Sequence, residues 1–293
     1  MTRRTVLASL LAAAVSGTPR RLFAQSSPSF SVDVRMVEVY ATVFDEHGRY
    51  VDGLDRDAFE IRDDGKPQSI LDFGGTSDPL ACALLLDTTG SMEKVLPQVR
   101  SSILEFIDKL GPLESIAIYT FDTGLRLRQE FTTDKLAARR AVMRTRAGGE
   151  TALFDALAQT AHEIAKRKGK KVIVLFTDGQ DNASALSAAA AENSARKIGV
   201  PVYTIAEGEA LESKSLIGTL RDIARKTGGT ASVVRKPEDV SAVFDEISSD
   251  LQHTYLISYK APPVSEPRWR TIQVALRQPG KYKIRAKQGY FPD

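Results

Sequence analysis

The sequence contains little cysteine, no long hydrophobic run and no large excess of charge of either sign. Its 293 residues include one cysteine, Cys82, so no disulfide can form within the chain. No apolar run reaches the roughly 18 residues that a membrane-spanning helix needs. With 42% hydrophobic and 26% charged residues, the composition excludes collagen-like, low-complexity and coiled-coil proteins. The length is sufficient for one or two globular domains.

The formal net charge of +3 arises at the beginning of the sequence. The first 24 residues contain no acidic residue but four arginines, namely Arg3, Arg4, Arg20 and Arg21. Without these arginines the chain has 36 basic and 37 acidic residues, so the remainder is almost neutral. A neutral chain gives no electrostatic reason to expect binding to nucleic acid or to an anionic membrane.

Residues 1–24 have the pattern of a signal peptide. The charged start at Arg3-Arg4 is followed by an apolar run from Val6 to Val15 and by the small residue Ala24. The run of about ten residues is too short for a permanent transmembrane anchor. Arg3-Arg4 resembles a twin-arginine export motif, although Leu22 near the cleavage site leaves the general secretory route open. We therefore expect a periplasmic or secreted protein; a structural N-terminal helix is the alternative.

Residues 25–78 have the alternating pattern of β-strands. From Ser31 to Phe44, apolar residues recur at every second position, with a phase shift near Met36 that indicates a bulge. A strand at Phe59–Arg62 and a return strand at Gln68–Phe73 flank a hairpin turn of the Asp-Gly type.

The β pattern returns in residues 251–293. Strands are predicted at Tyr255–Tyr259, Trp269–Leu276 and Tyr282–Ala286. Neither flank has enough strands for a stable sheet of its own. We therefore expect residues 251–293 to pair with residues 25–78 in one β-sandwich-like module.

Residues 79–250 alternate between continuous apolar runs and helix-patterned segments. The apolar runs are Ala81–Leu86, Ile116–Phe121, Val172–Phe176 and Val202–Ile205. The predicted helices are Lys94–Leu110, Asp134–Arg144, Ala152–Lys168, Ala183–Ile198, Ser215–Lys226 and Pro237–Leu251. Strands that are apolar throughout are typical of a parallel sheet covered on both faces. We expect a doubly wound α/β domain, with a mainly parallel sheet, inserted in the β module.

Oxygen-bearing side chains gather at the ends of the predicted apolar strands. Asp87, Thr89 and Ser91 follow the first of these strands, Thr151 precedes a predicted helix, and Asp178 follows the third strand. In an open parallel sheet, ligands bind at the carboxyl ends of the strands. Carboxylates and hydroxyls without nearby His or Cys suit a hard divalent cation. We expect a divalent-metal site, with Mg²⁺ as the first choice and Mn²⁺ or Ca²⁺ as alternatives.

The same residues resemble the metal-ion-dependent adhesion site of von Willebrand factor type A domains. The resemblance is carried by Asp87-x-Thr89-Gly-Ser91, by Thr151 before a helix, and by Thr177-Asp178-Gly179 after an apolar strand. It implies that the hydroxyls of Thr89, Ser91 and Thr151 reach the metal. It also implies that Asp87 and Asp178 neutralise the charge of the metal. In that family one coordination position stays open, and an acidic side chain of a partner protein commonly fills it.

The resemblance extends over most of the chain. The segments that carry it are Gly53-Leu54, Phe59, Asp64-Gly65, Thr227-Gly228-Gly229, Tyr255-x-Ile257-x-Tyr259 and Gly289-Tyr290. Together they are similar to the exported type A proteins described from Acidobacteria. One departure is Thr89, because the family usually has Ser there and the extra methyl group restricts χ1 beside the metal.

Several residues also have simpler interpretations. Taken alone, Asp87 is a helix cap, and Asp122 and Asp181 are turn residues, although Asp181 can also support the metal site from behind. The three histidines share no metal-ligand spacing, and Cys82 is expected to be a small buried hydrophobe. The lysine-rich run 166–171 is expected to be a solvated helix end, with a phosphate-binding patch as the alternative.

Three functions fit these observations. The first is a non-enzymatic binding module whose metal takes an Asp or Glu from a partner protein. The second is a secreted scaffold in which the metal joins three loops. The third is a Mg²⁺-dependent phosphoryl-transfer enzyme with Asp87 as nucleophile or base. Against the enzyme, Thr89 stands where haloacid dehalogenase-type phosphotransferases need a second Asp. The sequence also contains no GxGxxG, P-loop, GxSxG or HExxH motif.

Overall fold

The structure, a computed structural model, describes residues 36–263 and 268–292. The predicted signal peptide, the strand residues that precede Met36 and the bulge expected there lie outside the described residues or at their edge. Within the described residues, no helix is both long enough and apolar enough to cross a membrane.

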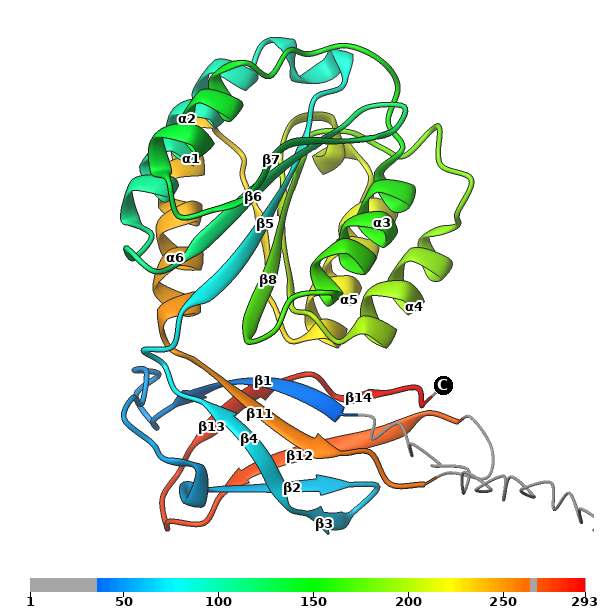
Figure 1. The fold of residues 1–293 in the computed structure, drawn as a ribbon. Coiled ribbons are helices and arrows are strands. Elements are labelled where there is room, and N and C mark those ends of the chain that lie inside the picture. Colours follow the sequence, from blue (N-terminus) through cyan, green and yellow to red (C-terminus); the bar gives the residue numbers. More distant parts are fainter. Residues whose placement is uncertain (1–35, 264–267, 293) are drawn as a thin grey trace, which may run out of the picture. The chain divides into compact units, whose positions relative to one another are not determined.

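The centre of the α/β part is a six-stranded sheet of order β10-β9-β8-β5-β6-β7 (Figure 1). Its strands are β5 (Leu80–Asp87), β6 (Ser115–Phe121), β7 (Leu125–Thr132), β8 (Lys170–Thr177), β9 (Val202–Ala206) and β10 (Ala231–Val233). β7 alone among these strands pairs antiparallel with its neighbour. Every residue of β5 and β8 is buried, as their continuous apolar runs predict.

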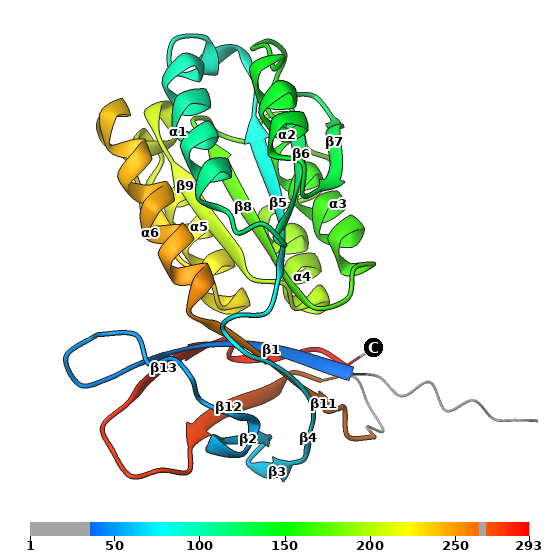
Figure 2. The same cartoon turned by 60° about the vertical axis from the view of Figure 1, so that its left-hand side comes forward.

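Helices cover both faces of this sheet, as Figures 1 and 2 show. One face carries α1 (Leu96–Lys109), α2 (Lys135–Met143) and α6 (Val240–Gln252). The other face carries α3 (Leu153–Ala165), α4 (Ala188–Ile198) and α5 (Lys214–Thr227). Along β5, Leu84 and Leu86 contribute to the first core and Ala83 and Leu85 to the second. The α/β fold class predicted from the sequence is confirmed.

Two four-stranded antiparallel sheets form the β part. Their orders are β13-β1-β11-β4 and β14-β12-β2-β3. The strands are β1 (Met36–Phe44), β2 (Phe59–Asp63), β3 (Lys66–Gln68), β4 (Ile70–Gly74), β11 (Thr254–Lys260), β12 (Arg270–Leu276), β13 (Lys283–Ala286) and β14 (Gly289–Tyr290). β1 pairs with β11 and β2 pairs with β12, so each sheet combines strands from both flanks. A third apolar core includes residues of both sheets.

The hairpin predicted at Asp-Gly is present, but its return strand is two strands. Asp64 and Gly65 have φ angles of 49° and 76°, the left-handed values that an Asp-Gly turn supplies. β3 returns along β2, whereas β4 pairs with β11 in the other sheet. The chain therefore changes sheets at Ser69, a change that was not predicted from the sequence.

Other boundaries also differ from the sequence predictions. β7 and β10 were not predicted, because β7 is rich in charge and β10 has three residues. α4 begins at Ala188 because the Ser187 hydroxyl accepts the N–H of Ala190. Short 3₁₀ turns lie at Arg56–Ala58, Gly90–Glu93, Gly208–Glu212 and Pro237–Asp239, and the last of these precedes α6 where a continuous helix was expected.

Two lysines expected in a solvated helix end are instead buried at the start of β8. Lys170 and Lys171 are 3% and 4% exposed. Lys171 Nζ forms an ion pair of 2.8 Å with Glu38 of β1, and Lys170 Nζ donates to the carbonyl of Thr76 at 3.2 Å. These bonds connect the α/β and β parts.

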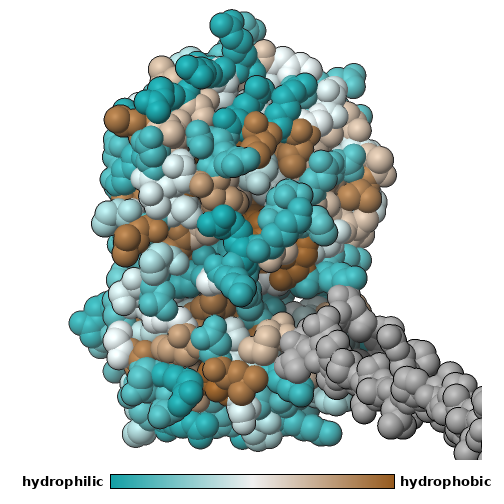
Figure 3. Space-filling view, viewed as in Figure 1, coloured by the Kyte–Doolittle hydropathy of each residue, from teal (hydrophilic) through white to brown (hydrophobic). Residues whose placement is uncertain are grey.

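On the face drawn in Figure 3, apolar residues are scattered among hydrophilic ones over both parts.

Candidate metal centre

The five predicted metal-site residues lie at one edge of the six-stranded sheet. Asp87 is the last residue of β5, and Asp178 directly follows β8. Because β5 and β8 are parallel neighbours, their carboxyl ends lie side by side (Figure 1). Thr89 and Ser91 stand at the start of the loop after β5, and Thr151 lies just before α3.

Hydrogen bonds bring four of the five side chains into one network. Ser91 Oγ donates to Asp178 Oδ1 at 2.9 Å and lies 3.1 Å from Thr89 Oγ1. Asp87 Oδ1 accepts the N–H of Thr89 at 2.9 Å. Thr151 approaches from its own loop: a Cβ placed on Gly179 would lie 3.6 Å from Ser91 Oγ and 3.7 Å from Thr151 Oγ1. The structure thus places all five residues around one point.

The electrostatic state of this cluster is unusual. Asp87 is 0% and Asp178 is 2% exposed. Burial, and after it the charge of Asp87, raises the pKa of Asp178 to about 7. Burial also raises the pKa of Asp87, although hydrogen bonds from Thr177 and Thr89 oppose the shift. Among the ion pairs of the described residues, neither carboxylate has a cationic partner. Two buried carboxylates that repel each other in this way favour a bound cation.

The donor set fits a hard cation. It offers two carboxylates and three hydroxyls, all of them oxygen donors of the kind that Mg²⁺, Mn²⁺ and Ca²⁺ take. Across residues 36–263 and 268–292, no group of three or more His, Cys, Asp or Glu could hold a metal. A cation at this edge would therefore depend on the hydroxyls of Thr89, Ser91 and Thr151 as well as on the two carboxylates.

Neighbouring residues hold this geometry, and of these the sequence pointed to Asp181 as a possible support. Thr177 Oγ1 donates to Asp87 Oδ2 at 2.7 Å, which fixes the carboxylate. Asp87 ends β5 and is not a helix cap, because the 3₁₀ turn that follows has Thr89 at its N-cap. Asn182 accepts the N–H of Thr151 at 2.8 Å. Asp181 accepts the N–H of Phe154 at 3.1 Å, so it anchors the start of α3. The supporting roles of Thr177 and Asn182 gave no signal in the sequence, because their partners lie 90 and 31 positions away.

Glu207 is another buried carboxylate near this edge. It follows β9, is 3% exposed, and its pKa is raised by burial. Its N–H donates to the carbonyl of Thr177 at 3.1 Å, but among the described residues its Oε2 has no hydrogen-bond partner. The sequence interpretation missed Glu207 because an acidic residue after a strand reads as part of a surface turn.

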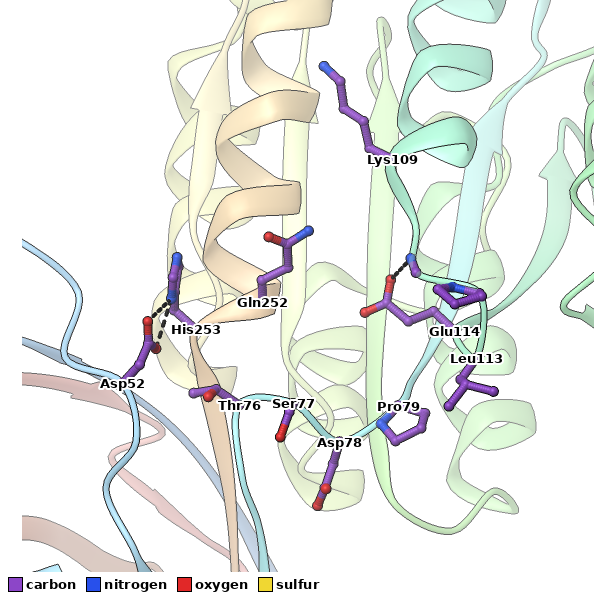
Figure 4. A pocket seen from close by; sticks show the side chains of 12 residues that line it. Asp52, Thr76, Ser77, Asp78, Pro79, Lys109, Leu113, Glu114, Gln252 and His253 are labelled. Atoms are coloured by element: carbon purple, nitrogen blue, oxygen red, sulfur yellow. Dashed lines mark hydrogen bonds and ion pairs between the residues drawn. The ribbon is translucent and has the colours of Figure 1, made fainter.

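A hollow of about 440 Å³ elsewhere contains an Asp–His pair, drawn in Figure 4. His253 Nδ1 lies 2.7 Å from Asp52 Oδ2, and the His253 ring stacks on Tyr50 at 4.2 Å between centroids. Ser77 lines the same hollow, but its side chain lies away from the pair (Figure 4). No hydrogen bond between Ser77 and His253 is present, so the described residues form no Ser-His-Asp triad there.

Cys82 is fully buried, as predicted, and burial raises the pKa of its thiol.

Solved structures with the same fold have low sequence identity to this chain. A von Willebrand factor type A protein from Catenulispora acidiphila matches with a TM-score of 0.54 and 16% identity, over 89% of this chain and 74% of that one. Proximal thread matrix protein 1 from the mussel byssus matches with a TM-score of 0.53 and 18% identity, over 64% of this chain and 49% of that one. The von Willebrand domain of the type V pili tip protein Mfa5 from Porphyromonas gingivalis matches with a TM-score of 0.50 and 14% identity, over 58% and 94%.

A search of the curated proteins returned no match. The narrower similarity to exported Acidobacterial proteins therefore stays a prediction. The family model of the von Willebrand factor type A domain matches residues 82–246, which is more than half of the chain and includes all five residues of the candidate metal centre. The chain belongs to the von Willebrand factor type A domain family.

Proposed function

We propose that this protein is an exported, divalent-metal-dependent protein-binding module. Asp87, Thr89, Ser91, Thr151 and Asp178 would hold the cation, with Mg²⁺ as the first choice and Mn²⁺ or Ca²⁺ as alternatives. A bound cation would supply a coordination position that an Asp or Glu of a partner protein could fill. The observation that carries the proposal is the pair of buried carboxylates without a cationic partner among the described residues, surrounded by hydroxyls.

The chain's own residues have separate roles in this proposal. Asp87 and Asp178 provide the negative charge, and the bond from Thr177 keeps Asp87 oriented. The Ser91 residue is exposed to solvent, whereas Thr89 is buried. Asn182 holds the Thr151 loop through two hydrogen bonds. Export is supported by the pattern of residues 1–24, and a periplasmic or secreted location follows from it.

The loop contacts favour a binding module over a scaffold joined by metal. Gly90 donates its N–H to the carbonyl of Gly149 at 3.3 Å, and Ser91 donates to Asp178 at 2.9 Å. The three loops are therefore connected by hydrogen bonds of the protein itself. An enzymatic role has less support, because Thr89 stands where phosphotransferases of the haloacid dehalogenase type need a second Asp.

Binding of Mn²⁺ to the full chain, followed by electron paramagnetic resonance, tests the metal site. We expect wild type to bind one Mn²⁺, Asp87→Asn to lose binding, and Glu150→Gln to retain it. Glu150 is a matched control because it is an exposed carboxylate next to Thr151 but outside the site. Equal Mn²⁺ affinity in all three proteins would reject the metal site.

Copurification with and without chelator tests the binding function. A partner that requires the metal should be lost on chelation and from Asp87→Ala, while the melting temperature in chelator stays high enough for a folded protein. A partner retained under both conditions would contradict the mechanism. A large loss of stability on chelation would favour the scaffold instead.

A further inference from the structure

A second surface of the molecule concentrates positive charge. A hollow of about 620 Å³ lies between α5 and β10 of the α/β part and β12 and the segment 283–288 of the β part. Five cationic residues line this hollow, which we call the basic groove: Arg221, Arg225, Lys283, Arg285 and Lys287. No Asp or Glu is among the lining residues.

The five cations differ in how far the protein already satisfies them. Arg225 donates to Gln288 at 3.1 Å and to Asp222 at 3.2 Å, and Arg285 bonds to Asp250 from inside the protein. Arg221 and Lys283 are exposed. Neither of them has an ion pair within the described parts of the chain. The rim of the basic groove thus presents two cations available to an external anion.

Lys287 is the most buried cation of the groove, at 5% exposed. Burial lowers its pKa to about 8, and the nearby Lys171 acts in the same direction while Glu38 opposes it. Its Nζ lies 2.7 Å from where a Cβ on Gly199 would be, at the C-terminal end of α4. The helix C-terminus offers partial negative charge but not a full counter-charge.

The floor of the basic groove is apolar. Ile272 and Val274 of β12 and Ile284 of β13 line it, and all three also pack against the core of the β part. An anion that is only a point charge, such as inorganic phosphate, would leave these side chains uncovered. A ligand with apolar groups between its charges would bury them.

Two sheet edges with no second strand partner among the described residues border the same groove. β13 is the end strand of the sheet β13-β1-β11-β4, and β10 is the end strand of the six-stranded sheet. Within the described residues, β13 pairs with β1 and β10 pairs with β9, each on one side alone. The end strand of a sheet can accept an added extended segment through backbone hydrogen bonds.

We propose that the basic groove binds an extended acidic segment of a partner protein, in which Asp or Glu alternate with apolar residues. The backbone of this segment pairs with the edge of β13, its carboxylates contact Arg221 and Lys283, and its apolar side chains cover Ile272, Val274 and Ile284. The site shares no residue with the candidate metal centre, so the proposal does not depend on a bound cation.

Fluorescence polarisation with a labelled ten-residue peptide of alternating Glu and Val tests the proposal on the full chain. We expect saturable binding that EDTA does not change and that the double variant Arg221→Glu, Lys283→Glu weakens at least tenfold. The control Lys214→Glu, Lys66→Glu reverses two exposed cations outside the groove and should bind like wild type. Circular dichroism melts of both double variants confirm that they fold.

Further probes decide which feature of the peptide matters. A peptide with Gln in place of Glu, and one with Pro at every second position, should both bind at least tenfold more weakly. Equal binding by the groove variant, by the Gln peptide or by the Pro peptide would overturn the proposal. Polyphosphate that binds as tightly as the Glu-Val peptide would indicate a general anion site and overturn it as well. Wild-type dimers that the groove variant converts to monomers in light scattering would assign the surface to a second copy of this chain instead.

Discussion

Buried carboxylates in the two parts of the molecule are satisfied in different ways. Asp63 in the β part is 0% exposed. It accepts hydrogen bonds from Arg270 at 2.6 Å, Tyr259 at 2.9 Å and Tyr290 at 2.8 Å. Asp87 in the α/β part is equally buried, but it accepts hydrogen bonds from a hydroxyl and a backbone N–H. It lies close enough to Asp178 for its charge to raise the pKa of that carboxylate.

This difference separates a structural carboxylate from a candidate binding site. Asp63 has its counter-charge within the chain, so its burial is complete without any ligand. Asp87 and Asp178 have none among the described residues, and each raises the cost of ionising the other. The first arrangement holds β2 and β12 together, whereas the second would hold an external cation under the proposed function. The following changes test this contrast, from the largest expected effect to the smallest.

Removal of the cation beside Asp63 should be strongly destabilising. Arg270→Met leaves a buried carboxylate without its guanidinium partner, a change that costs about 3–5 kcal/mol. Urea unfolding measures the loss. Arg268→Met is the control, because Arg268 is 64% exposed and its ion pair with Asp64 should contribute about 1 kcal/mol or less. Similar losses in both variants would contradict the assignment of Asp63 as a buried ion pair.

Lys287 tests the cost of a buried cation that forms no ion pair within the described residues, although the charge of Glu38 acts on it. Its pKa of about 8 in the fold lies below the ordinary 10.5, so the folded chain releases this proton before the unfolded chain does. Stability should therefore rise as the pH rises from 8 to 10. Lys287→Met should raise the free energy of unfolding by about 3 kcal/mol at pH 7. In this variant the increase of stability between pH 8 and 10 should be smaller. The control Lys281→Met, at an exposed lysine, should change neither the stability at pH 7 nor its pH dependence. A loss of stability in Lys287→Met at pH 7 would contradict a buried cation that destabilises the fold.

The metal-free site predicts a pH dependence of the opposite sign. Because the pKa of Asp178 is raised to about 7, the folded chain keeps a proton that the unfolded chain loses near pH 4. Stability without metal should therefore fall as the pH rises from 4 to 7. Bound Mg²⁺ would compete with this proton. Above pH 7, Mg²⁺ at a hundredfold excess over Kd should therefore raise the free energy of unfolding by about 2.7 kcal/mol. At pH 5 the same Mg²⁺ concentration should raise it by much less. Thermal melts with and without Mg²⁺ measure this, and a Mg²⁺ effect that does not depend on pH would contradict it.

The smallest expected effect is a gain in stability when one carboxylate of the candidate metal centre is neutralised. Asp178→Asn removes the repulsion with Asp87 and should stabilise the metal-free protein by about 1 kcal/mol at pH 8 while it abolishes Mg²⁺ binding. Glu150→Gln should change neither quantity. A destabilised Asp178→Asn would place Asp178 in the same structural class as Asp63.

The parts of the fold that follow from local pattern could be predicted from the sequence. Strands buried on both faces are apolar throughout, which identified β5, β6, β8 and β9. The carboxyl-end rule for parallel sheets then placed Asp87 and Asp178 at one edge. The Asp64-Gly65 turn was predicted because few other residue pairs adopt two positive φ angles.

Features that depend on distant partners could not be predicted. Lys170 and Lys171 look like part of a solvated run until Glu38 and the carbonyl of Thr76 are placed beside them. β7 has a charged, exposed pattern and becomes a strand because β6 pairs with it. Thr177 and Asn182 support the site through bonds to residues 90 and 31 positions away, a relation that a single sequence does not contain.

We propose that one divalent cation is held jointly by Asp87, Thr89, Ser91, Thr151 and Asp178. The most direct measurement is an anomalous difference map from crystals of the full chain grown with Mn²⁺ at pH 8. We expect one strong peak within coordination distance of Ser91 and Thr89, flanked by the two carboxylates, and no such peak in Asp178→Asn crystals. A map without a peak among these five residues, from crystals that hold Mn²⁺ elsewhere, would contradict it.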